Sequence, residues 1–255
     1  MLRDKEVTSF RVSDGNTIKF EYRASLPSTA EIAREYANAG YPDRYVIFTE
    51  RQTQHTAFSD GSQGLYLSCI LRPSIFPSQA SSVGPLAALS LALALEEHTS
   101  KKIGIGWVSD VYCDGMKLGS CTVEGKLDNY TSYEYLIINY AVKLGEKNFP
   151  PRMTDMLRKV FENDNTSVAM IIAKTVLNKF FAAYRNIKAP ERIMDEYKNK
   201  FALIGQQVKY IEDGKRKPGK IIDLDKKTCA LIVENKEGKQ IKITSPSCVI
   251  IPSKI

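Results

Sequence analysis

The pattern of strand-like segments changes once along the chain, near Gly205, and this change constrains the fold more than any other feature. Before it, short apolar strand segments alternate with helix segments, which is typical of a mixed sheet flanked by helices. After it, turn signals separate five short segments with strand character, at residues 207–211, 219–223, 230–234, 240–243 and 248–251. Such a series favours a small SH3-like β-barrel. The sequence therefore predicts two domains, residues 1–200 and residues 201–255.

Turn and cap residues place the elements of the first domain. Asp14-Gly15 marks a hairpin between strands at residues 7–12 and 18–22. Ser28 followed by Glu31 is a capping-box pattern, which predicts that a helix begins there. Further strands are expected at residues 45–49, 64–71, 103–107, 111–123 (a hairpin) and 133–142, and further helices at residues 82–98, 153–162, 167–186 and 190–200. This mixture of elements predicts an α+β domain.

Charge and hydropathy exclude several functional classes. The net charge is +7, and residues 201–255 hold 11 Lys and Arg against 6 Asp and Glu. A basic surface favours acidic partners, but the lysines are scattered without interleaved aromatic residues, which argues against DNA as a partner. No segment approaches the roughly 18 consecutive apolar residues of a membrane helix, and the N-terminus lacks the apolar core of a signal peptide. We therefore expect a cytoplasmic protein without membrane contact.

The metal-binding residue types are sparse. The chain has 5 cysteines and 2 histidines, with no C-x-x-C pair and no Cys/His cluster. A zinc site needs about four ligands close together. The sequence predicts no metal site, and it predicts buried free thiols, as expected in a reducing compartment.

Three separate segments offer chemistry. Ser28-Thr29 lies at the beginning of the first helix, where hydroxyls and free N–H groups cap the helix or bind a polar or anionic ligand. Arg51-Gln52 follows a buried strand, which suits either a ligand crevice or a solvated loop. Asp110 lies between two expected strands, where it could hold a metal ion. Lys117 follows a tight turn, as an exposed strand residue or as the partner of a carboxylate or phosphate.

The order of these segments resembles the biotin–protein ligases. That family carries S-T-N, Q-T-x-G-R-G-R-x-G-R-x-W, L-Y-L-S, L-R-P, K-W-P-N-D and G-K-K-x-x-G in this order. This chain has similar segments in the same succession: Ser28-Thr29, Gln52-Thr53, Leu65-Tyr66-Leu67-Ser68, Leu71-Arg72-Pro73, Trp107-x-x-Asp110 and Asp114-Gly115-x-Lys117. The likeness includes the C-terminal strands and covers nearly the whole chain.

The resemblance implies the fold and the reaction of the family. The fold is the class II synthetase-like biotin/lipoate ligase fold, an α+β mixed sheet flanked by helices, followed by a C-terminal SH3-like β-barrel. In the reaction, biotin and ATP with Mg²⁺ form biotinyl-AMP, and a lysine of a biotin carboxyl carrier domain then takes the biotin. A homodimer is a further possibility within the family.

The resemblance also implies a role for particular residues. Those expected to bind biotin are Ser28, Thr29, Gln52 and Lys117. The expected catalytic residues are Lys117 and Asp110. Lys117 would lie at the biotin carboxylate and the adenylate phosphate, and Asp110 near the acceptor lysine. The residues expected at the nucleotide are Arg51, Trp107 and Asn139, of which Asn139 matches the asparagine of the family's G-x-G-x-N strand.

The chain departs from the family where phosphates are held. Between Thr53 and Phe58 the glycines and arginines are missing and four other residues stand instead. Gly106 occupies the position of the lysine of K-W-P-N-D, Ser120 that of the last glycine of G-K-K-x-x-G, and Tyr135 and Ile137 replace the glycines of G-x-G-x-N. Each 1.36 kcal/mol of lost transition-state binding slows a reaction about tenfold.

Three interpretations stay open at this point. The chain is an active ligase, a non-catalytic or regulatory homologue that binds a biotin-like ligand or the carrier, or a lipoate or octanoate transferase. The residues before Thr17 leave no room for a winged-helix domain, so we expect no repressor role.

Overall fold

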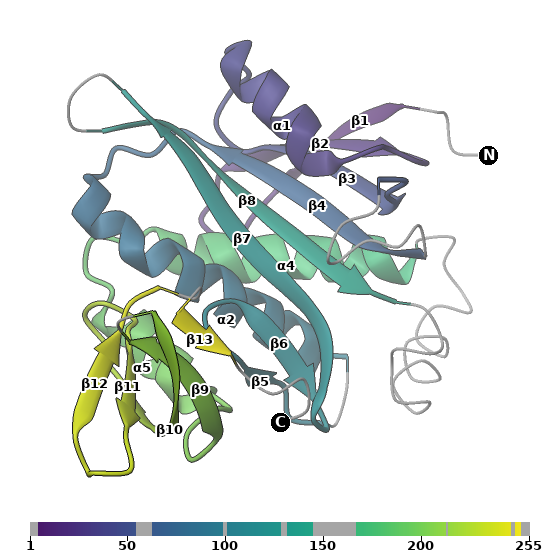
Figure 1. Ribbon diagram of the computed structural model, residues 1–255. Coiled ribbons are helices and arrows are strands. Elements are labelled where there is room, and N and C mark those ends of the chain that lie inside the picture. Colours follow the sequence, from purple (N-terminus) through teal and green to yellow (C-terminus); the bar gives the residue numbers. More distant parts are fainter. Residues whose placement is uncertain are drawn as a thin grey trace.

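The computed structural model describes residues 5–54, 63–98, 101–128, 132–144, 167–212, 214–245 and 248–250. Within these residues eight strands form one mixed sheet in the order β1-β2-β3-β4-β8-β7-β6-β5 (Figure 1). The strands are β1 (Glu6–Arg11), β2 (Thr17–Arg23), β3 (Tyr45–Arg51), β4 (Gln63–Leu71), β5 (Gly104–Ile105), β6 (Asp110–Cys113), β7 (Met116–Leu127) and β8 (Tyr133–Lys143). Neighbouring strands are antiparallel except β2 and β3. Because parallel neighbours need a crossover, α1 (Thr29–Asn38) connects β2 to β3 across one face of the sheet.

Helices cover both faces of this sheet (Figure 1). On one face α1 packs on Tyr45 and Ile47 of β3, whereas Val46 and Phe48 belong to the core on the opposite face. That opposite core contains α2 (Val83–Glu96), which follows a 3-10 helix (Pro77–Ser82), and α4 (Val168–Tyr184). Alternation along β3 thus produces two cores, because successive side chains of a strand point to opposite faces.

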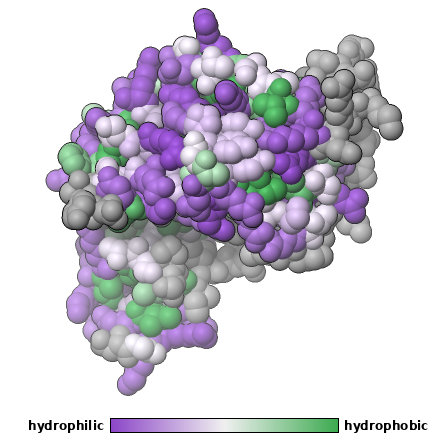
Figure 2. Space-filling model, turned by 90° about the horizontal axis from the view of Figure 1, so that it is seen from above, coloured by the Kyte–Doolittle hydropathy of each residue, from purple (hydrophilic) through white to green (hydrophobic). Residues whose placement is uncertain are grey.

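The two helix layers differ in their exposure. The buried residues of α1 are Thr29, Ala33 and Ala37, so the rest of its surface faces solvent. Viewed from the top of Figure 1, where α1 lies, the surface is mostly hydrophilic with small separate hydrophobic areas (Figure 2). By contrast, α2 is buried on nearly every side because it packs against the sheet, α4 and α5 (Glu191–Asn199). None of the described helices has the length and apolar character needed to cross a membrane.

The C-terminal strands form a second, antiparallel sheet in the order β12-β11-β10-β9-β13. They are β9 (Gln207–Glu212), β10 (Lys215–Leu224), β11 (Leu231–Glu234), β12 (Gln240–Ile243) and β13 (Val249–Ile250). The five expected strands are therefore present, while closure into an SH3-like barrel stays a prediction. Val208 and Leu231 of this sheet share one hydrophobic core with the large sheet. The division into residues 1–200 and 201–255 also stays a prediction.

Local sequence signals placed most elements of the large sheet correctly. The hairpin at Asp14-Gly15 and the α+β character are confirmed. The turn between β6 and β7 has positive φ at both Asp114 (48°) and Gly115 (76°), the conformation that the Asp-Gly pair favours. The strand expected at residues 103–107 is shorter, since the Gly106 N–H turns to the Asp110 carbonyl. The helix expected at residues 153–162 lies outside the described residues.

Candidate functional site

The beginning of α1 lies beside the end of β3. Ser28 is the N-cap, and its hydroxyl accepts a hydrogen bond from the Glu31 N–H at 3.3 Å, as the capping pattern predicted. Gln52 forms a parallel bridge with Leu26, and its side-chain oxygen accepts from the Thr29 N–H at 3.0 Å. The fold thus joins two of the sequence segments, Ser28-Thr29 and Gln52, at one place.

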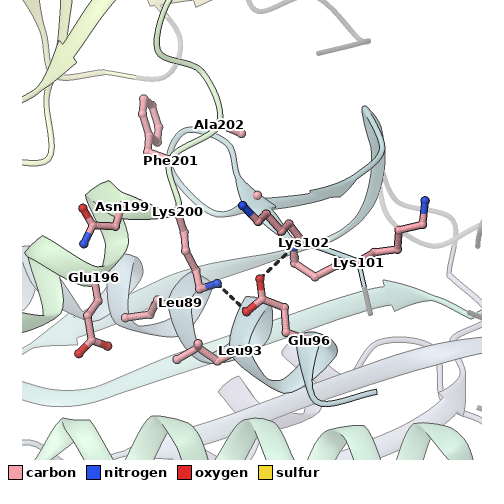
Figure 3. A pocket seen from close by; sticks show the side chains of 12 residues that line it. Leu89, Leu93, Glu96, Lys101, Lys102, Glu196, Asn199, Lys200, Phe201 and Ala202 are labelled. Carbon is pink, nitrogen blue, oxygen red and sulfur yellow. Dashed lines mark hydrogen bonds and ion pairs between the residues drawn. The ribbon is translucent and has the colours of Figure 1, made fainter. Parts of the chain in front are cut away.

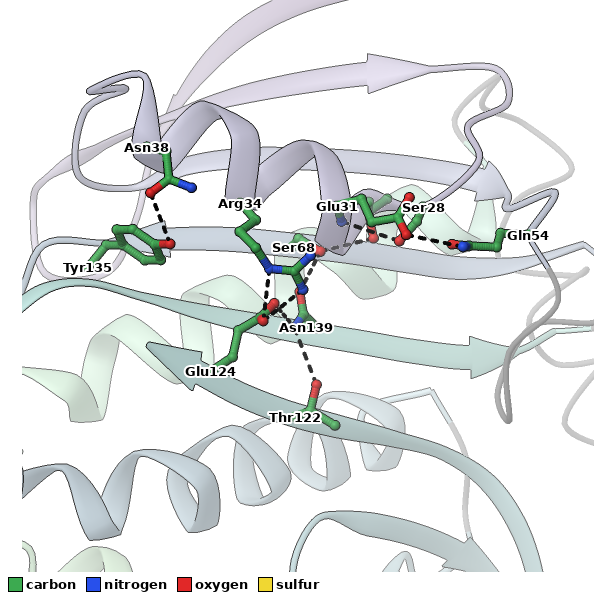
Figure 4. A network of polar contacts seen from close by, with 11 residues as sticks. Ser28, Glu31, Arg34, Asn38, Gln54, Ser68, Thr122, Glu124, Tyr135 and Asn139 are labelled. Atoms are coloured by element: carbon green, nitrogen blue, oxygen red, sulfur yellow. Dashed lines mark hydrogen bonds and ion pairs between the residues drawn. The ribbon is translucent and has the colours of Figure 1, made fainter. Parts of the chain in front are cut away.

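A chain of polar side chains crosses the sheet beneath α1 (Figure 4). The Ser68 hydroxyl of β4 lies 2.9 Å from the Thr29 hydroxyl and 2.7 Å from the side-chain oxygen of Asn139 on β8. The Asn139 amide nitrogen donates at 3.3 Å to the Glu124 carboxylate of β7. Arg34 of α1 holds that carboxylate through contacts of 2.8 and 3.2 Å. Hydrogen bonds between these groups keep each side chain oriented without a ligand.

Several of these side chains line one small cavity. Its volume is about 130 Å³, and it is lined by Ser28, Thr29, Ala30, Gln52, Tyr66, Ser120, Thr122, Asn139, Tyr140 and Ala141. Ligand pockets commonly measure about 300–1,000 Å³. The cavity therefore has space for a small polar head group, whereas the remainder of a larger ligand must extend out of it.

Asp110 and Lys117 lie together on the strands next to this cavity. The Lys117 ammonium is 2.7 Å from the Asp110 carboxylate, and about a third of its side chain is exposed. Asp110 is opposite Ser120 in the β6–β7 register, and Ser120 lines the cavity. The sequence predicts that Thr29, Gln52, Asp110 and Lys117 act on one ligand. The structure places Thr29 and Gln52 in the cavity wall. Asp110 and Lys117 lie beside the cavity, paired with each other.

Gly106 lies where the family has a lysine, and Tyr112 fills the space above it. A Cβ atom on Gly106 would lie 2.6 Å from Cε2 of the Tyr112 ring, closer than real contacts allow. The Tyr112 hydroxyl donates to Asp110 at 3.4 Å. Burial, together with the Asp110 charge and hydrogen bond, raises the pKa of Tyr112 to about 12. The space beside Gly106, which the resemblance matches to a lysine, is thus filled by a neutral phenol.

The three residues expected at the nucleotide have different surroundings. Trp107 is buried, and its indole N–H donates to the Cys229 carbonyl at 2.8 Å, which directs the ring toward the C-terminal sheet. Arg51 is exposed at the end of β3, with no ion pair to another described residue. Asn139 lies in the cavity wall. Trp107 therefore contributes to the contact with the C-terminal part of the chain, and its expected role at the nucleotide stays a prediction.

Several residues of this series of polar side chains are not predicted as site residues by the sequence. Ser68 was noticed within Leu65-Tyr66-Leu67-Ser68 but received no role, although alternation along β4 puts it on the α1 face. Arg34 and Glu124 are 90 residues apart, and no local pattern links them. Only the pairing of β4 with β8 and of β8 with β7 brings these side chains together.

A larger cavity lies on the opposite side of the large sheet from α1 (Figures 1 and 3). It measures about 760 Å³, and its walls come from the end of α2, residues 101–104 and the end of α5. An ion pair of 2.6 Å between Lys200 and Glu96 crosses it. Glu96 also accepts from the Ile103 N–H at 3.0 Å, so this carboxylate already has two partners within the fold.

Comparisons with known proteins agree with the geometry. No family model matches the chain. The bifunctional ligase/repressor BirA of Bacillus subtilis is 24% identical over 143 residues, which cover 53% of this chain and 44% of BirA. A crystal structure of biotin protein ligase from Aquifex aeolicus matches 91% of this chain and 98% of its own, with a TM-score of 0.67 and 20% identity. The chain has the fold of these biotin protein ligases.

Other solved structures share this fold. The Aquifex aeolicus ligase in complex with biotin and ATP has a TM-score of 0.65 and 19% identity over 91% of this chain and 99% of its own. A biotin protein ligase-like protein of unknown function from Silicibacter sp. is nearly as similar, with a TM-score of 0.66 and 14% identity over 93% of this chain and 97% of its own. These likenesses establish the fold. The match to BirA spans less than half of BirA, so the activity of the whole BirA protein is not transferred with it.

Proposed function

We propose that this chain binds biotin at the beginning of α1 and activates it with ATP as a biotin–protein ligase. The observation that supports this most is the convergence of Thr29, Gln52 and Asn139, from three separate segments, on one cavity, with Ser68 behind its wall linking Thr29 to Asn139. Their donors and acceptors suit a compact neutral head group such as a cyclic urea. The valeryl chain of biotin would leave the cavity beside Ser120, toward Lys117.

The proposed activation step uses Lys117 as a cation. A carboxylate oxygen of biotin attacks the α-phosphorus of ATP, the bond between that phosphorus and the bridging oxygen breaks, and pyrophosphate leaves. The carboxylate and the triphosphate repel each other, and an ammonium group between them lowers that barrier. Lys117 would exchange its contact with Asp110 for these oxygens.

The transfer step places Asp110 at the acceptor. The amine of a carrier lysine attacks the carbonyl carbon of biotinyl-AMP, the carbon–oxygen bond breaks, and AMP leaves with the electron pair. Asp110, released by Lys117, would accept or orient the proton of the amine. The acceptor in this proposal is a biotin carboxyl carrier domain, and its recognition would benefit from the excess of positive charge on this chain.

Mg²⁺ enters this proposal as the companion of ATP. Among the described residues, no three His, Cys, Asp or Glu side chains gather as a metal site. These described residues therefore offer no cluster of three such ligands, and Asp110 is the carboxylate of the proposed site that would contact the ion beside the phosphates. Mg²⁺ typically keeps several waters and binds through substrate phosphates.

A second candidate function is binding of a biotin-like ligand without chemistry. The observation that favours it is the closed space above Gly106, where Tyr112 leaves no room for a second cation beside Lys117. Loss of one such cation costs several kcal/mol of transition-state stabilisation in comparable sites. The cavity beneath α1 would be unaffected by that loss.

Pyrophosphate exchange separates these candidates. The full chain is incubated with ATP, Mg²⁺ and labelled pyrophosphate, with biotin, lipoate, octanoate or no acid. An active ligase incorporates label into ATP with biotin and not without it. Saturable calorimetric binding of biotin without exchange supports the non-catalytic binder. Exchange that depends on lipoate or octanoate and ignores biotin would contradict the biotin assignment.

A further inference from the structure

Glu124 connects an exposed cation to the wall of the cavity. One carboxylate oxygen accepts both contacts from Arg34, and the other accepts from the Asn139 amide nitrogen. About half of the Arg34 side chain is exposed, so the ion pair lies at the surface, while Ser68 and Thr29 at the other end of the chain are buried. Glu124 itself does not line the cavity. Its influence on a ligand must therefore pass through Asn139.

The carboxylate fixes the direction of the hydrogen bonds. Glu124 can accept but cannot donate, so Asn139 turns its NH₂ group toward Glu124 and its oxygen toward Ser68. Ser68 has one hydroxyl hydrogen, and the Asn139 oxygen at 2.7 Å takes it. At the 2.9 Å contact between the two hydroxyls, Thr29 is then the donor and Ser68 the acceptor.

This direction determines what Thr29 offers to a ligand. With its hydrogen directed at Ser68, the Thr29 hydroxyl presents lone pairs to the cavity and accepts a hydrogen bond. The Gln52 side-chain oxygen accepts from the Thr29 N–H at 3.0 Å and lies 3.5 Å from the Thr29 hydroxyl, so the closer Ser68 oxygen, at 2.9 Å, is the better acceptor for the hydroxyl hydrogen. A ligand group facing Thr29 must therefore carry a donor, such as an N–H, and a group with an acceptor alone meets lone pairs.

We propose that Glu124, held by Arg34, is a positioning residue that sets this hydrogen-bond direction and thereby makes the cavity select ligands with an N–H donor. The inference rests on the proposed function in that the ligand is biotin, whose ring nitrogens both carry hydrogen. A glutamine at position 124 would still contact Asn139. The amide of this glutamine has a donor and an acceptor, so the hydrogen bonds from Glu124 to Thr29 could run in either direction.

Calorimetric titration of the full chain tests this proposal. The probes are biotin and two analogues, each methylated on one ring nitrogen. We expect wild type to reject at least one analogue about tenfold or more, since methylation removes a donor. Glu124→Gln should bind biotin about tenfold more weakly and should discriminate less between biotin and that analogue. Arg34→Gln keeps the carboxylate and should keep the discrimination.

Glu134→Gln is the matched control. Glu134 forms a similar surface ion pair, 2.8 Å from Lys126, on the strand that carries Asn139, but it does not contact that residue. This variant should bind both kinds of probe as wild type does. Unchanged biotin affinity and discrimination in Glu124→Gln would overturn the proposal, as would equal loss of discrimination in Arg34→Gln, which would point to a structural role of the ion pair.

A second measurement judges the hydrogen-bond direction without a ligand. If wild type fails to bind biotin, the proposed function is contradicted, and the side-chain amide protons of Asn139 still report on Glu124. By NMR, they should exchange slowly with solvent in wild type and Glu134→Gln and faster in Glu124→Gln. Equal exchange in all three proteins would overturn the positioning role.

Discussion

The cavity beneath α1 and the β5–β7 corner beside it differ in the state of their polar groups. At the cavity, Thr29 and Asn139 of the wall are linked by Ser68 behind it, and this chain of hydrogen bonds keeps the atoms that face the cavity in place. At the corner, Lys117 is already paired with Asp110, and Tyr112 fills the space above Gly106. Under the proposed function, recognition of a head group tolerates divergence better than phosphate chemistry, because recognition needs oriented neutral groups whereas phosphate chemistry needs available cations.

The largest expected effect concerns the cavity. Thr29→Val removes the hydroxyl that faces the ligand and leaves Ser68 without its donor. Loss of one partner from a buried hydrogen-bonded pair costs about 1–3 kcal/mol, so biotin should bind about 10- to 100-fold more weakly in calorimetric titration. The matched control is Thr175→Val on α4, whose hydroxyl bonds to its own helix at Ile171. An equal loss in the control would refute a specific role for Thr29.

The next effect tests the corner and separates its two charged residues. Lys117→Ala should remove most of the affinity for biotin, because the carboxylate of biotin loses the cation proposed to contact it. Asp110→Asn removes the competing carboxylate while Lys117 stays, so affinity for biotin should rise by a few fold. Lys101→Ala, which breaks the similar Lys101–Asp114 pair of the same region, is the control. Binding that is unchanged in Lys117→Ala would exclude this lysine from the site.

A smaller effect concerns the packing at the corner. Gly106→Ala puts a methyl group against the Tyr112 ring and should lower the free energy of unfolding by about 1–3 kcal/mol, as overpacking does. Tyr112→Leu removes the ring edge, so the double variant should be more stable than the sum of the single effects predicts. Thermal unfolding measures both. Gly84→Ala, where Cγ1 of Val108 lies 4.0 Å from the added Cβ, should be tolerated. Simple additivity would show that Tyr112 does not close this space.

The smallest effect concerns Glu21 of β2, which lies beneath α1 and accepts hydrogen bonds from Tyr36 of that helix and from Tyr45 of β3. Glu21 is fully buried; burial alone would raise its pKa, but hydrogen bonds from Tyr45, Arg23 and Lys5 outweigh burial and lower it. A carboxyl whose folded pKa is lowered stabilises the fold above its unfolded pKa, near 4.5, and this contribution is lost as the pH falls through the folded value. Urea unfolding between pH 7 and pH 3 should show this loss, and Glu21→Gln should reduce the pH dependence. If the free energy of unfolding depends on pH in the same way in Glu21→Gln, this dependence comes from other groups.

The sequence predicted those parts of the structure that depend on neighbours along the chain. The Ser28 cap, the Asp-Gly turns and the five C-terminal strands follow from short patterns that carry their own physical cause. The ion pair of Arg34 with Glu124 depends on strand order and helix placement, which no local pattern determines. Trp107 shows the same limit, because its partner Cys229 lies 122 residues further along the chain, in the connection between β10 and β11. A motif identifies such a residue but not the direction of its side chain.

Direct titration of biotin into the full chain, without ATP, tests the central claim that the cavity beneath α1 is a working head-group site. The account predicts saturable binding of one biotin per chain, weakened at least tenfold in Thr29→Val and unchanged in Thr175→Val. Absence of any saturable heat with a folded wild-type protein at millimolar biotin would contradict it.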